Sequence, residues 1–223
     1  MEWYWIVAIA VGSVAVLLVL SNIFYKQFFK RFYDIVLSSI ALIVLSPLLL
    51  ILTIVGAIAM GGNPFFVQPR PGKIDPKTGK ERIFSLLKFR TMTDERDENG
   101  NLLPDAQRLT RYGCSLRTSS LDELPSLLNI IKSDLSIVGP RPLLVKYLPR
   151  YSEEQRHRHD VRPGLTGYAQ AHGRNALSWE DRFSMDVWYT ENVSLKLDVQ
   201  IILDTIKVVL KREGISSATS DTM

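Results

Sequence analysis

The chain has 223 residues, a formal net charge of +4 and a single cysteine, Cys114. The length allows one domain plus membrane segments, and a lone cysteine excludes an internal disulfide. Between residues 141 and 174, seven Lys/Arg face three Asp/Glu, so this segment carries the whole net charge. A modest, local positive charge is typical of a protein that meets a membrane surface or a phosphorylated ligand, and it does not indicate a nucleic-acid partner.

The chain begins with an apolar segment. No charged residue occurs from Trp3 to Tyr25, and a helix of that length reaches roughly 34 Å, enough to span a bilayer. A cleaved signal peptide is the alternative, but the segment lacks a positively charged start and a small-residue cleavage site. We therefore predict a transmembrane anchor over residues 1–27, with its N-terminus outside and the following lysines in the cytoplasm.

A second uncharged run, residues 35–60, lies in a membrane segment predicted over residues 28–60. Ser46 and Pro47 stand at its middle, where a proline removes a backbone hydrogen bond and bends the helix. Basic residues are dense on both flanks, and a crossing helix cannot keep both flanks in the cytoplasm. We predict a re-entrant helix that bends at Ser46-Pro47 and returns, with the serine hydroxyl covering a freed carbonyl. A straight spanning helix is the alternative.

The rest of the chain, residues 61–213, is predicted as a cytoplasmic domain. Residues 64–68 and 82–89 read as the strands of a β-hairpin, with the turn at 75–79. Helical patterns dominate the remainder, so the expected fold class is α+β, mainly α with a small β-hairpin. The polar residues 214–223 are predicted to form a disordered tail.

An acidic pair, Asp122 and Glu123, opens the next predicted helix, and a Pro-Arg-Pro turn around Arg141 follows it. Two carboxylates at a helix start can supply one nucleophile and one ligand for a hard cation. A guanidinium fixed between prolines suits a phosphate. The residues also fit a capping box of Ser120 and Glu123 with no catalytic role, and spacing alone favours that interpretation. The catalytic interpretation depends on the rest of the chain.

Residues 152–159 are predicted to form a charged helix in which Arg156 and Arg158 are solvated. His157 and His159 stand two residues apart, so on a helix they point to different sides and no metal pair is expected.

The last predicted helix is amphipathic. It carries an apolar stripe at helical spacing, with lysines off the stripe, and both a packing helix and a helix lying on anionic lipid explain this pattern. The stripe consists of Leu195, Val199, Ile202, Ile206 and Val209. The glycine-rich loops around Arg162 and Arg174 carry neither a dinucleotide-binding nor a P-loop motif.

Nine short motifs occur in a fixed order: 30–34, Ser46-Pro47, 66–72, 88–92, 116–117, 120–125, 138–142, 161–164 and 173–175. Together they resemble the bacterial sugar transferase family of monotopic phosphoglycosyl transferases, and most of all its small PglC-type members. The resemblance covers about residues 28–215. The chain departs from the pattern in its extra N-terminal membrane segment, and in His172, where asparagine usually precedes Gly-Arg-Asn.

The resemblance implies an enzyme, a polyprenyl-phosphate sugar-1-phosphate transferase on the cytoplasmic face of a bacterial inner membrane. It would take a sugar-1-phosphate from a UDP-sugar, pass it to undecaprenyl phosphate and release UMP, as the first membrane step of a glycoconjugate pathway. The likeness of residues 173–179 to PglC-type members indicates an N-acetylated amino sugar. Membrane lipids, a second copy of the chain and downstream glycosyltransferases are compatible partners.

The resemblance also assigns roles to residues. Asp122 would be the nucleophile, forming an aspartyl-phosphosugar, and Glu123 would bind Mg²⁺. The cations expected to bind substrate phosphates are Lys88, Arg117, Arg141, Arg162 and Arg174. Two other classes stay open: a membrane glycosyltransferase that releases UDP, and a non-catalytic scaffold whose basic 141–174 segment docks on lipid headgroups.

Overall fold

The structure, a computed structural model, describes residues 2–173 and 177–211. The predicted class is confirmed, since the described chain is mainly helical with a small antiparallel hairpin. The helices are α1 (Glu2–Ile23), the π-helix η1 (Tyr25–Phe29), α2 (Lys30–Met60), α3 (Asp105–Arg108), α4 (Arg111–Ser119), the 3₁₀ helix η2 (Leu121–Ser126), α5 (Leu127–Ile131), η3 (Val145–Arg150), α6 (Glu153–Arg156), η4 (His157–His159), α7 (Tyr168–His172), α8 (Trp179–Glu191) and α9 (Leu195–Lys211). The strands are β1 (Phe65–Ile74), β2 (Glu81–Phe89), β3 (Ser136–Val138) and β4 (Gly164–Thr166).

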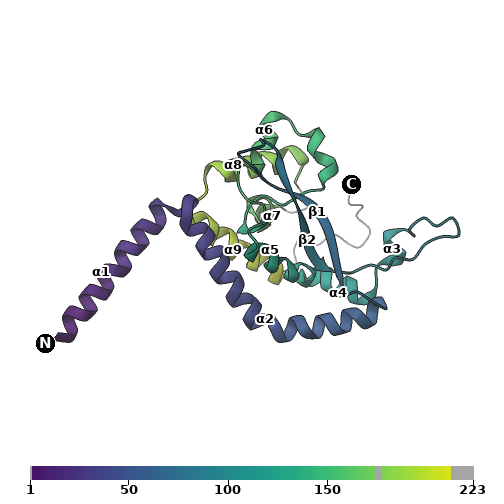
Figure 1. Cartoon of the computed structure of the whole chain (residues 1–223), viewed down its shortest axis with the longest axis horizontal. Helices are drawn as coiled ribbons and strands as arrows, with labels where there is room; N and C mark the ends of the chain where they lie inside the picture. Colours follow the sequence, from purple (N-terminus) through teal and green to yellow (C-terminus); the bar gives the residue numbers. More distant parts are fainter. Residues whose placement is uncertain (1, 174–176, 212–223) are drawn as a thin grey trace.

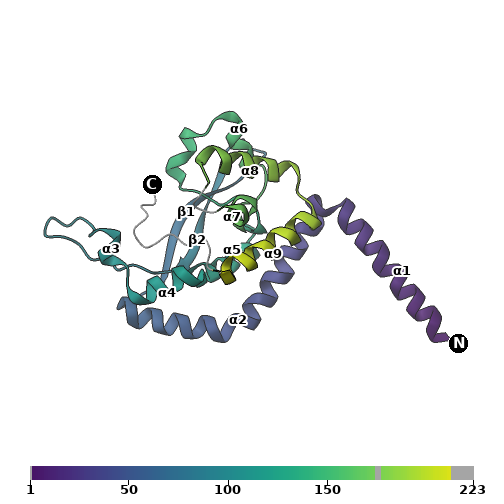
Figure 2. The same cartoon turned by 180° about the vertical axis from the view of Figure 1, so that it is seen from behind.

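The two N-terminal helices differ in how they lie against the rest of the chain. α1 projects away from the body, whereas α2 bends sharply at its middle (Figures 1 and 2). Among the described residues, the segment Tyr25–Met60 is long and apolar enough to cross a membrane, by length and composition. The bend coincides with Pro47, and the Ser46 hydroxyl donates to the Ile43 carbonyl at 2.7 Å. That carbonyl is the one a non-proline residue at 47 would bond, so the predicted covering of a freed carbonyl is confirmed.

Both arms of α2 contact the same domain. In the first arm, the buried Asp34 carboxylate accepts the Ile137 backbone N–H at 2.9 Å. In the second arm, the Leu52 carbonyl accepts the Tyr112 hydroxyl at 2.7 Å. A β-carbon on Gly56 would lie 2.8 Å from that hydroxyl, so the absence of a side chain at residue 56 leaves room for Tyr112 against α2.

The hairpin is longer than its sequence pattern indicates. β1 runs on to Ile74 through Pro69 and Pro71, and it pairs antiparallel with β2. Prolines are tolerated because β1 has a single strand neighbour and leaves one edge unpaired. The predicted turn is confirmed: the Gly79 N–H donates to the Asp75 carbonyl, and Gly79 has a φ of +64°.

Two hydrophobic clusters hold the domain together. The first joins the hairpin, α5 and the first arm of α2, with Phe84, Leu86 and Ile130 at its centre. The second joins β3, α8 and α9 around Tyr189 and Ile201. The parallel pair β3–β4, which the sequence pattern did not predict, connects the two clusters. The segments around Glu123 therefore rest on a packed base.

The burial of α9 differs from a simple packing helix. Ile201 and Asp198 are its buried residues, whereas Val199 and Ile206 of the apolar stripe are 46% and 49% exposed. Packing within the described chain therefore does not account for the whole stripe. The interfacial interpretation of α9 stays a prediction.

The expectation that Arg158 is solvated was wrong. The segment 152–159 is a short helix, α6, followed by the 3₁₀ turn η4, and η4 directs Arg158 inward. Arg158 is 1% exposed and pairs with the equally buried Asp186 of α8. Arg156 lies nearer the surface, and it pairs with Glu81 of β2 at 2.9 Å.

Candidate active site

The acidic pair lies in the 3₁₀ helix η2, directly after a reversal of the chain at Ser120. Ser120 has a left-handed backbone, with φ 58°, and its side chain makes no capping hydrogen bond. A helix N-cap residue needs an extended backbone, so the capping-box interpretation of Ser120 and Glu123 was wrong. The residue instead ends α4, where its N–H reaches the Arg117 carbonyl. Asp122 and Glu123 therefore open η2 without a serine cap.

Two buried polar side chains attach this helical segment to β2. The Ser126 hydroxyl donates to the Leu87 carbonyl at 2.7 Å. Asn129 accepts the Leu87 N–H at 3.0 Å and donates to the Ser85 carbonyl at 2.8 Å. Buried polar groups paired in this way fix two elements in one register. The register brings Lys88, the next residue of β2, to Glu123.

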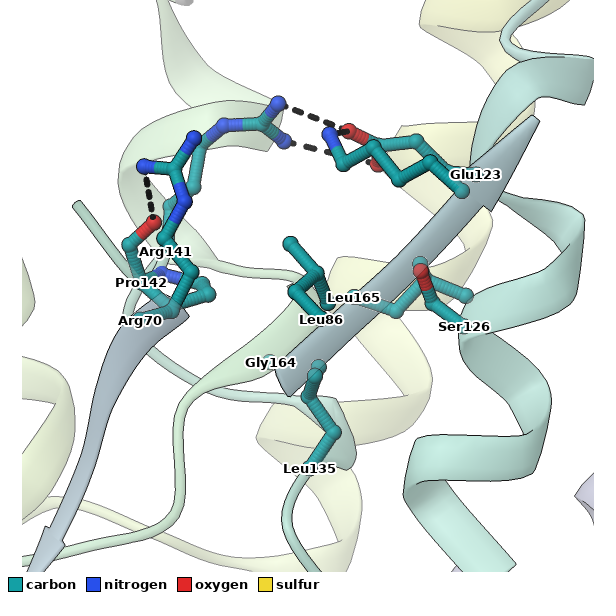
Figure 3. A pocket seen from close by; sticks show the side chains of 10 residues that line it. Arg70, Leu86, Glu123, Ser126, Leu135, Arg141, Pro142, Gly164 and Leu165 are labelled. Atoms are coloured by element: carbon teal, nitrogen blue, oxygen red, sulfur yellow. Dashed lines mark hydrogen bonds and ion pairs between the residues drawn. The ribbon is translucent and has the colours of Figure 1, made fainter. Parts of the chain in front are cut away.

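Glu123 is held between two cations, of which Figure 3 labels Arg141. Lys88 Nζ and Arg141 Nη2 both lie 2.7 Å from its Oε1 atom. Burial alone would raise the pKa of Glu123, but Arg141 and Lys88 outweigh burial and hold the pKa well below its usual range. Glu123 is therefore ionised at physiological pH, with positive charge on both sides.

Asp122 has a different environment. Burial and the neighbouring Glu123 raise its pKa, and Lys88, Arg141 and Arg117 only partly offset this effect. Within the described residues, its carboxylate takes part in no hydrogen bond or ion pair. The two adjacent carboxylates thus differ: Glu123 is bonded by cations, whereas Asp122 is free of such bonds among the described residues and has a raised pKa.

Glu123 borders a shallow open pocket, and Asp122, the residue before it in the chain, is not part of the pocket wall. The wall combines Arg70, Lys88, Glu123 and Arg141 with apolar side chains such as Leu86, Leu135 and Leu165 (Figure 3). Several positive groups around an opening of this kind can bind an anionic ligand.

Arg70 is the pocket residue that the sequence argument missed. Its Nη1 donates to the Pro142 carbonyl at 3.0 Å and its Nη2 bonds Gln68, while its buried Nε has no partner. Burial and then Arg141 lower the pKa of Arg70 to about 10, with Glu123 acting in the opposite direction. The only sequence signal was its place in the motif 66–72, because nothing in a strand pattern marks one arginine as buried.

The other candidate cations lie in different places. Arg117, on α4, donates to Thr91 at 3.1 Å and acts on Asp122 through space. Arg162 donates to the Ser133 carbonyl at 3.1 Å and, within the described part of the chain, makes no hydrogen bond or ion pair with Asp122 or Glu123. Arg174 lies outside the described residues.

The acidic pair also bears on metal binding. In the described part of the chain, no group of three or more His, Cys, Asp or Glu side chains converges on a common point. Mg²⁺ is commonly held by one or two carboxylates together with substrate phosphates and waters. The Glu123 carboxylate is bonded by Lys88 and Arg141 in this structure, so its binding of Mg²⁺ stays a prediction.

Comparison with known proteins identifies the family. The family model for bacterial sugar transferases matches residues 25–212. The chain is 52% identical over 186 residues to the uncharacterized sugar transferase EpsL of Bacillus subtilis, and this match covers 83% of the chain and 89% of EpsL. It is 37% identical over 202 residues to the exopolysaccharide production protein ExoY of Rhizobium meliloti, covering 83% and 87%.

A longer relative is the undecaprenyl-phosphate galactose phosphotransferase of Salmonella typhimurium, 34% identical over 206 residues. The match covers 85% of this chain but 42% of that protein. Matches of this extent, together with the family model, leave no other assignment. The chain belongs to the bacterial sugar transferase family.

Proposed function

We propose that the protein is a polyprenyl-phosphate sugar-1-phosphate transferase, which moves a sugar-1-phosphate from a UDP-sugar to undecaprenyl phosphate and releases UMP. The observation that carries the proposal is the adjacent pair of carboxylates: Glu123 is bonded by Lys88 and Arg141, whereas Asp122 makes no hydrogen bond or ion pair with the described residues. The names of relatives support the acceptor. Besides the Salmonella protein, a 36% identical Aeromonas hydrophila relative is named for N-acetylgalactosamine transfer and a 37% identical Xanthomonas campestris relative for glucose-1-phosphate transfer, both to undecaprenyl phosphate.

Asp122 is the proposed nucleophile. A carboxylate oxygen of Asp122 attacks the β-phosphorus of the UDP-sugar, and the bond between that phosphorus and the bridging oxygen breaks, so UMP leaves with that oxygen. An oxygen of undecaprenyl phosphate then attacks the same phosphorus, and the Asp122 carboxylate leaves. Splitting the transfer into two displacements is the general advantage of a covalent intermediate.

The surrounding cations answer the electrostatic problem of this reaction. A diphosphate brings negative charge to a negative nucleophile, so fixed positive charge is required to reduce the repulsion. Lys88, Arg141 and Arg70 face the pocket, and Arg117 lies close enough to lower the pKa of Asp122. Mg²⁺, held by Glu123 and the diphosphate, would supply further charge neutralisation.

The membrane arrangement is part of the proposal. The bend of α2 at Pro47 and the contacts of both arms with one domain support a re-entrant helix. The half-exposed apolar side chains of α9 support contact of that helix with lipid. In this arrangement a soluble sugar nucleotide and a membrane-bound polyprenyl phosphate reach Asp122 from the cytoplasmic side.

Cysteine labelling tests this topology. Single cysteines at positions 27 and 100, with Cys114 replaced, should resist a membrane-impermeant reagent applied to intact cells, whereas a cysteine at position 2 should react. Pro47→Leu restores the helical hydrogen bond, and it should make position 100 partly reactive and lower activity. Reaction of position 100 from outside in the chain with Pro47 intact would contradict the re-entrant form.

The activity is tested with a panel of UDP-sugars, undecaprenyl phosphate and Mg²⁺. We propose an N-acetylated amino sugar as the donor, with galactose and glucose donors as comparisons. The expected result is UMP release, and, without acceptor, a sugar-phosphate adduct on the peptide containing Asp122. Release of UDP would identify a glycosyltransferase instead, and no turnover of any donor would favour the lipid-docking scaffold.

A further inference from the structure

The turn that carries Arg141 is held by its own backbone carbonyls. Three successive carbonyls, those of residues 140–142, each accept a hydrogen bond from a different segment. The donors are the Gly164 N–H at 3.0 Å, Arg158 Nη2 at 2.8 Å and Arg70 Nη1 at 3.0 Å, in that order. Prolines at 140 and 142 have no N–H to donate, so the turn is oriented mainly by hydrogen bonds to these three carbonyls. The central carbonyl, that of Arg141, accepts its hydrogen bond from Arg158.

Arg158 is placed for this contact by a buried carboxylate. Its Nε and Nη2 atoms donate to Asp186 Oδ2 at 3.2 and 2.5 Å, and the two residues are 1% and 2% exposed. Nη2 is shared between Asp186 and the Arg141 carbonyl. A guanidinium is rigid and planar, so fixing one edge on Asp186 also fixes the direction of its bond to Arg141.

Aromatic rings fix the guanidinium plane. The Arg158 guanidinium carbon lies 5.7 Å from the Tyr151 ring centroid and 5.5 Å from that of Phe183. Its Nη1 donates to the Tyr151 hydroxyl at 3.4 Å. The side chain is thus constrained in direction by hydrogen bonds and in plane by rings.

The Arg141 side chain needs such support from its backbone. It is 43% exposed, and its hydrogen bonds to other described residues go to one carboxylate, that of Glu123. An exposed arginine whose backbone is not fixed by its neighbours populates several rotamers, and it loses this conformational entropy when it binds a ligand. The geometry of the turn at residues 140–142 therefore determines how well the Arg141 guanidinium can bind a ligand.

We propose that Arg158 and Asp186 form a positioning pair for the active site: they orient the turn at residues 140–142 so that the Arg141 guanidinium faces Glu123 and the donor diphosphate. The inference rests on the proposed function for its catalytic part. Neither residue of the pair touches substrate, and their effect on turnover passes through Arg141.

A double replacement separates positioning from stability. A buried ion pair can be exchanged for apolar residues of similar size with little loss of stability, whereas removing one partner leaves an unpaired buried charge. Arg158→Met combined with Asp186→Leu should therefore unfold within a few degrees of the unmutated protein. The same variant leaves the Arg141 carbonyl without its donor, and we expect kcat/KM for the UDP-sugar to fall about tenfold.

A mutant cycle identifies the route of the effect. In an Arg141→Ala background, the Arg158→Met/Asp186→Leu exchange should cause no further loss of turnover, because the group that it positions is already absent. Equal fractional losses in both backgrounds would overturn the proposal. The matched control is Arg156→Met/Glu81→Gln, which removes the neighbouring ion pair and should change turnover less than about twofold.

Amide hydrogen exchange gives a readout that does not depend on activity. The Gly164 N–H, which bonds the carbonyl of residue 140, should exchange faster in the Arg158→Met/Asp186→Leu variant than in the control. Unchanged exchange at Gly164 would overturn the positioning role even if the protein turned over no sugar nucleotide. Failure of turnover in the unmutated protein, with faster exchange in the variant, would contradict the proposed function alone.

Discussion

Asp198 and Glu123 are each bonded by a lysine at short range, yet their surroundings are opposite. Asp198 of α9 is 3% exposed, and it is bonded by Lys30 and by the hydroxyls of Tyr25 and Tyr189. Glu123 has one lysine and one arginine, and its side chain is 19% exposed beside the pocket. The first site closes on itself, whereas the second borders an opening.

The difference separates a structural anchor from the proposed active site. Around Asp198 one lysine balances one carboxylate, and Lys30 also donates to the Val138 carbonyl, so the start of α2 is fastened to β3, α8 and α9. Glu123 is a single carboxylate bonded by two cations, Lys88 and Arg141. The nearby Arg70 also has a buried Nε atom without a hydrogen-bond partner. Positive charge that is not used up internally is available to an incoming diphosphate.

The largest expected effect is that of Asp122→Asn. Loss of the nucleophile should reduce turnover by about 1,000-fold or more and abolish the covalent adduct. Because burial raises the pKa of Asp122, the ionised carboxylate opposes folding at neutral pH, and the amide should leave the unfolding temperature unchanged or higher. UMP release and thermal unfolding, measured on one preparation, check both statements. Near-native turnover would rule out Asp122 as the nucleophile.

Removing the Asp198 carboxylate, which anchors the start of α2, should lower the stability of the protein. Asp198→Asn leaves Lys30 buried without its carboxylate, which should lower the free energy of unfolding by about 3 kcal/mol. The control on the same helix is Asp204→Asn, whose partner Lys207 is 69% exposed, and exposed pairs of this kind contribute little. Denaturant titration in detergent distinguishes them. Equal losses in the two variants would remove the contrast between anchor and active site.

Arg141→Ala should act on turnover and leave the anchor intact. Charge-assisted bonds to a phosphate in a partly desolvated pocket are lost, so we expect kcat/KM to fall about 50-fold. Arg156→Ala removes a similar charge that faces Glu81 instead of the pocket, and should change kcat/KM less than about threefold. A loss as large for Arg156 as for Arg141 would show that general basicity, rather than the geometry of the site, is responsible.

The smallest expected effect is a shift in the pH profile. Asp122 must be ionised to attack, and its pKa is raised, so turnover should fall about tenfold per pH unit below that pKa. Glu123 raises the pKa of Asp122, so Glu123→Gln should move the acidic limb to lower pH. The pH dependence of UMP release, at saturating donor and Mg²⁺, measures the shift. An unmoved limb in that variant would mean that another group titrates.

Local chemistry made part of this structure predictable. The Ser46-Pro47 bend follows from proline's missing donor, and Ser46 bonds the same carbonyl that Pro47 cannot. The hairpin turn follows from Asp75 and Gly79. The adjacency of Asp122 and Glu123 marked the site because two carboxylates so close in sequence stay close in any fold.

Long-range burial was not predictable in the same way. Arg158 reads as a surface residue of a charged helix, and only the packing of α8 reveals that Asp186 lies opposite it. Ser120 satisfied the spacing of a capping box, but the reversal between α4 and η2 puts its backbone in a left-handed conformation. β3 and β4 have three residues each, too few to show an alternating pattern.

The attachment of both arms of α2 to one domain has a consequence for the lipid bilayer itself. The hydrophobic length of a spanning helix must match the full bilayer thickness, so the helix tilts or deforms the lipid when that thickness changes. A helix whose two ends are fixed to the same domain, through Asp34 and through Leu52, takes its depth from a single leaflet. In the proposed topology, the height of Glu123 above the headgroups is then set by the protein, and lengthening the lipid acyl chains should leave it unchanged.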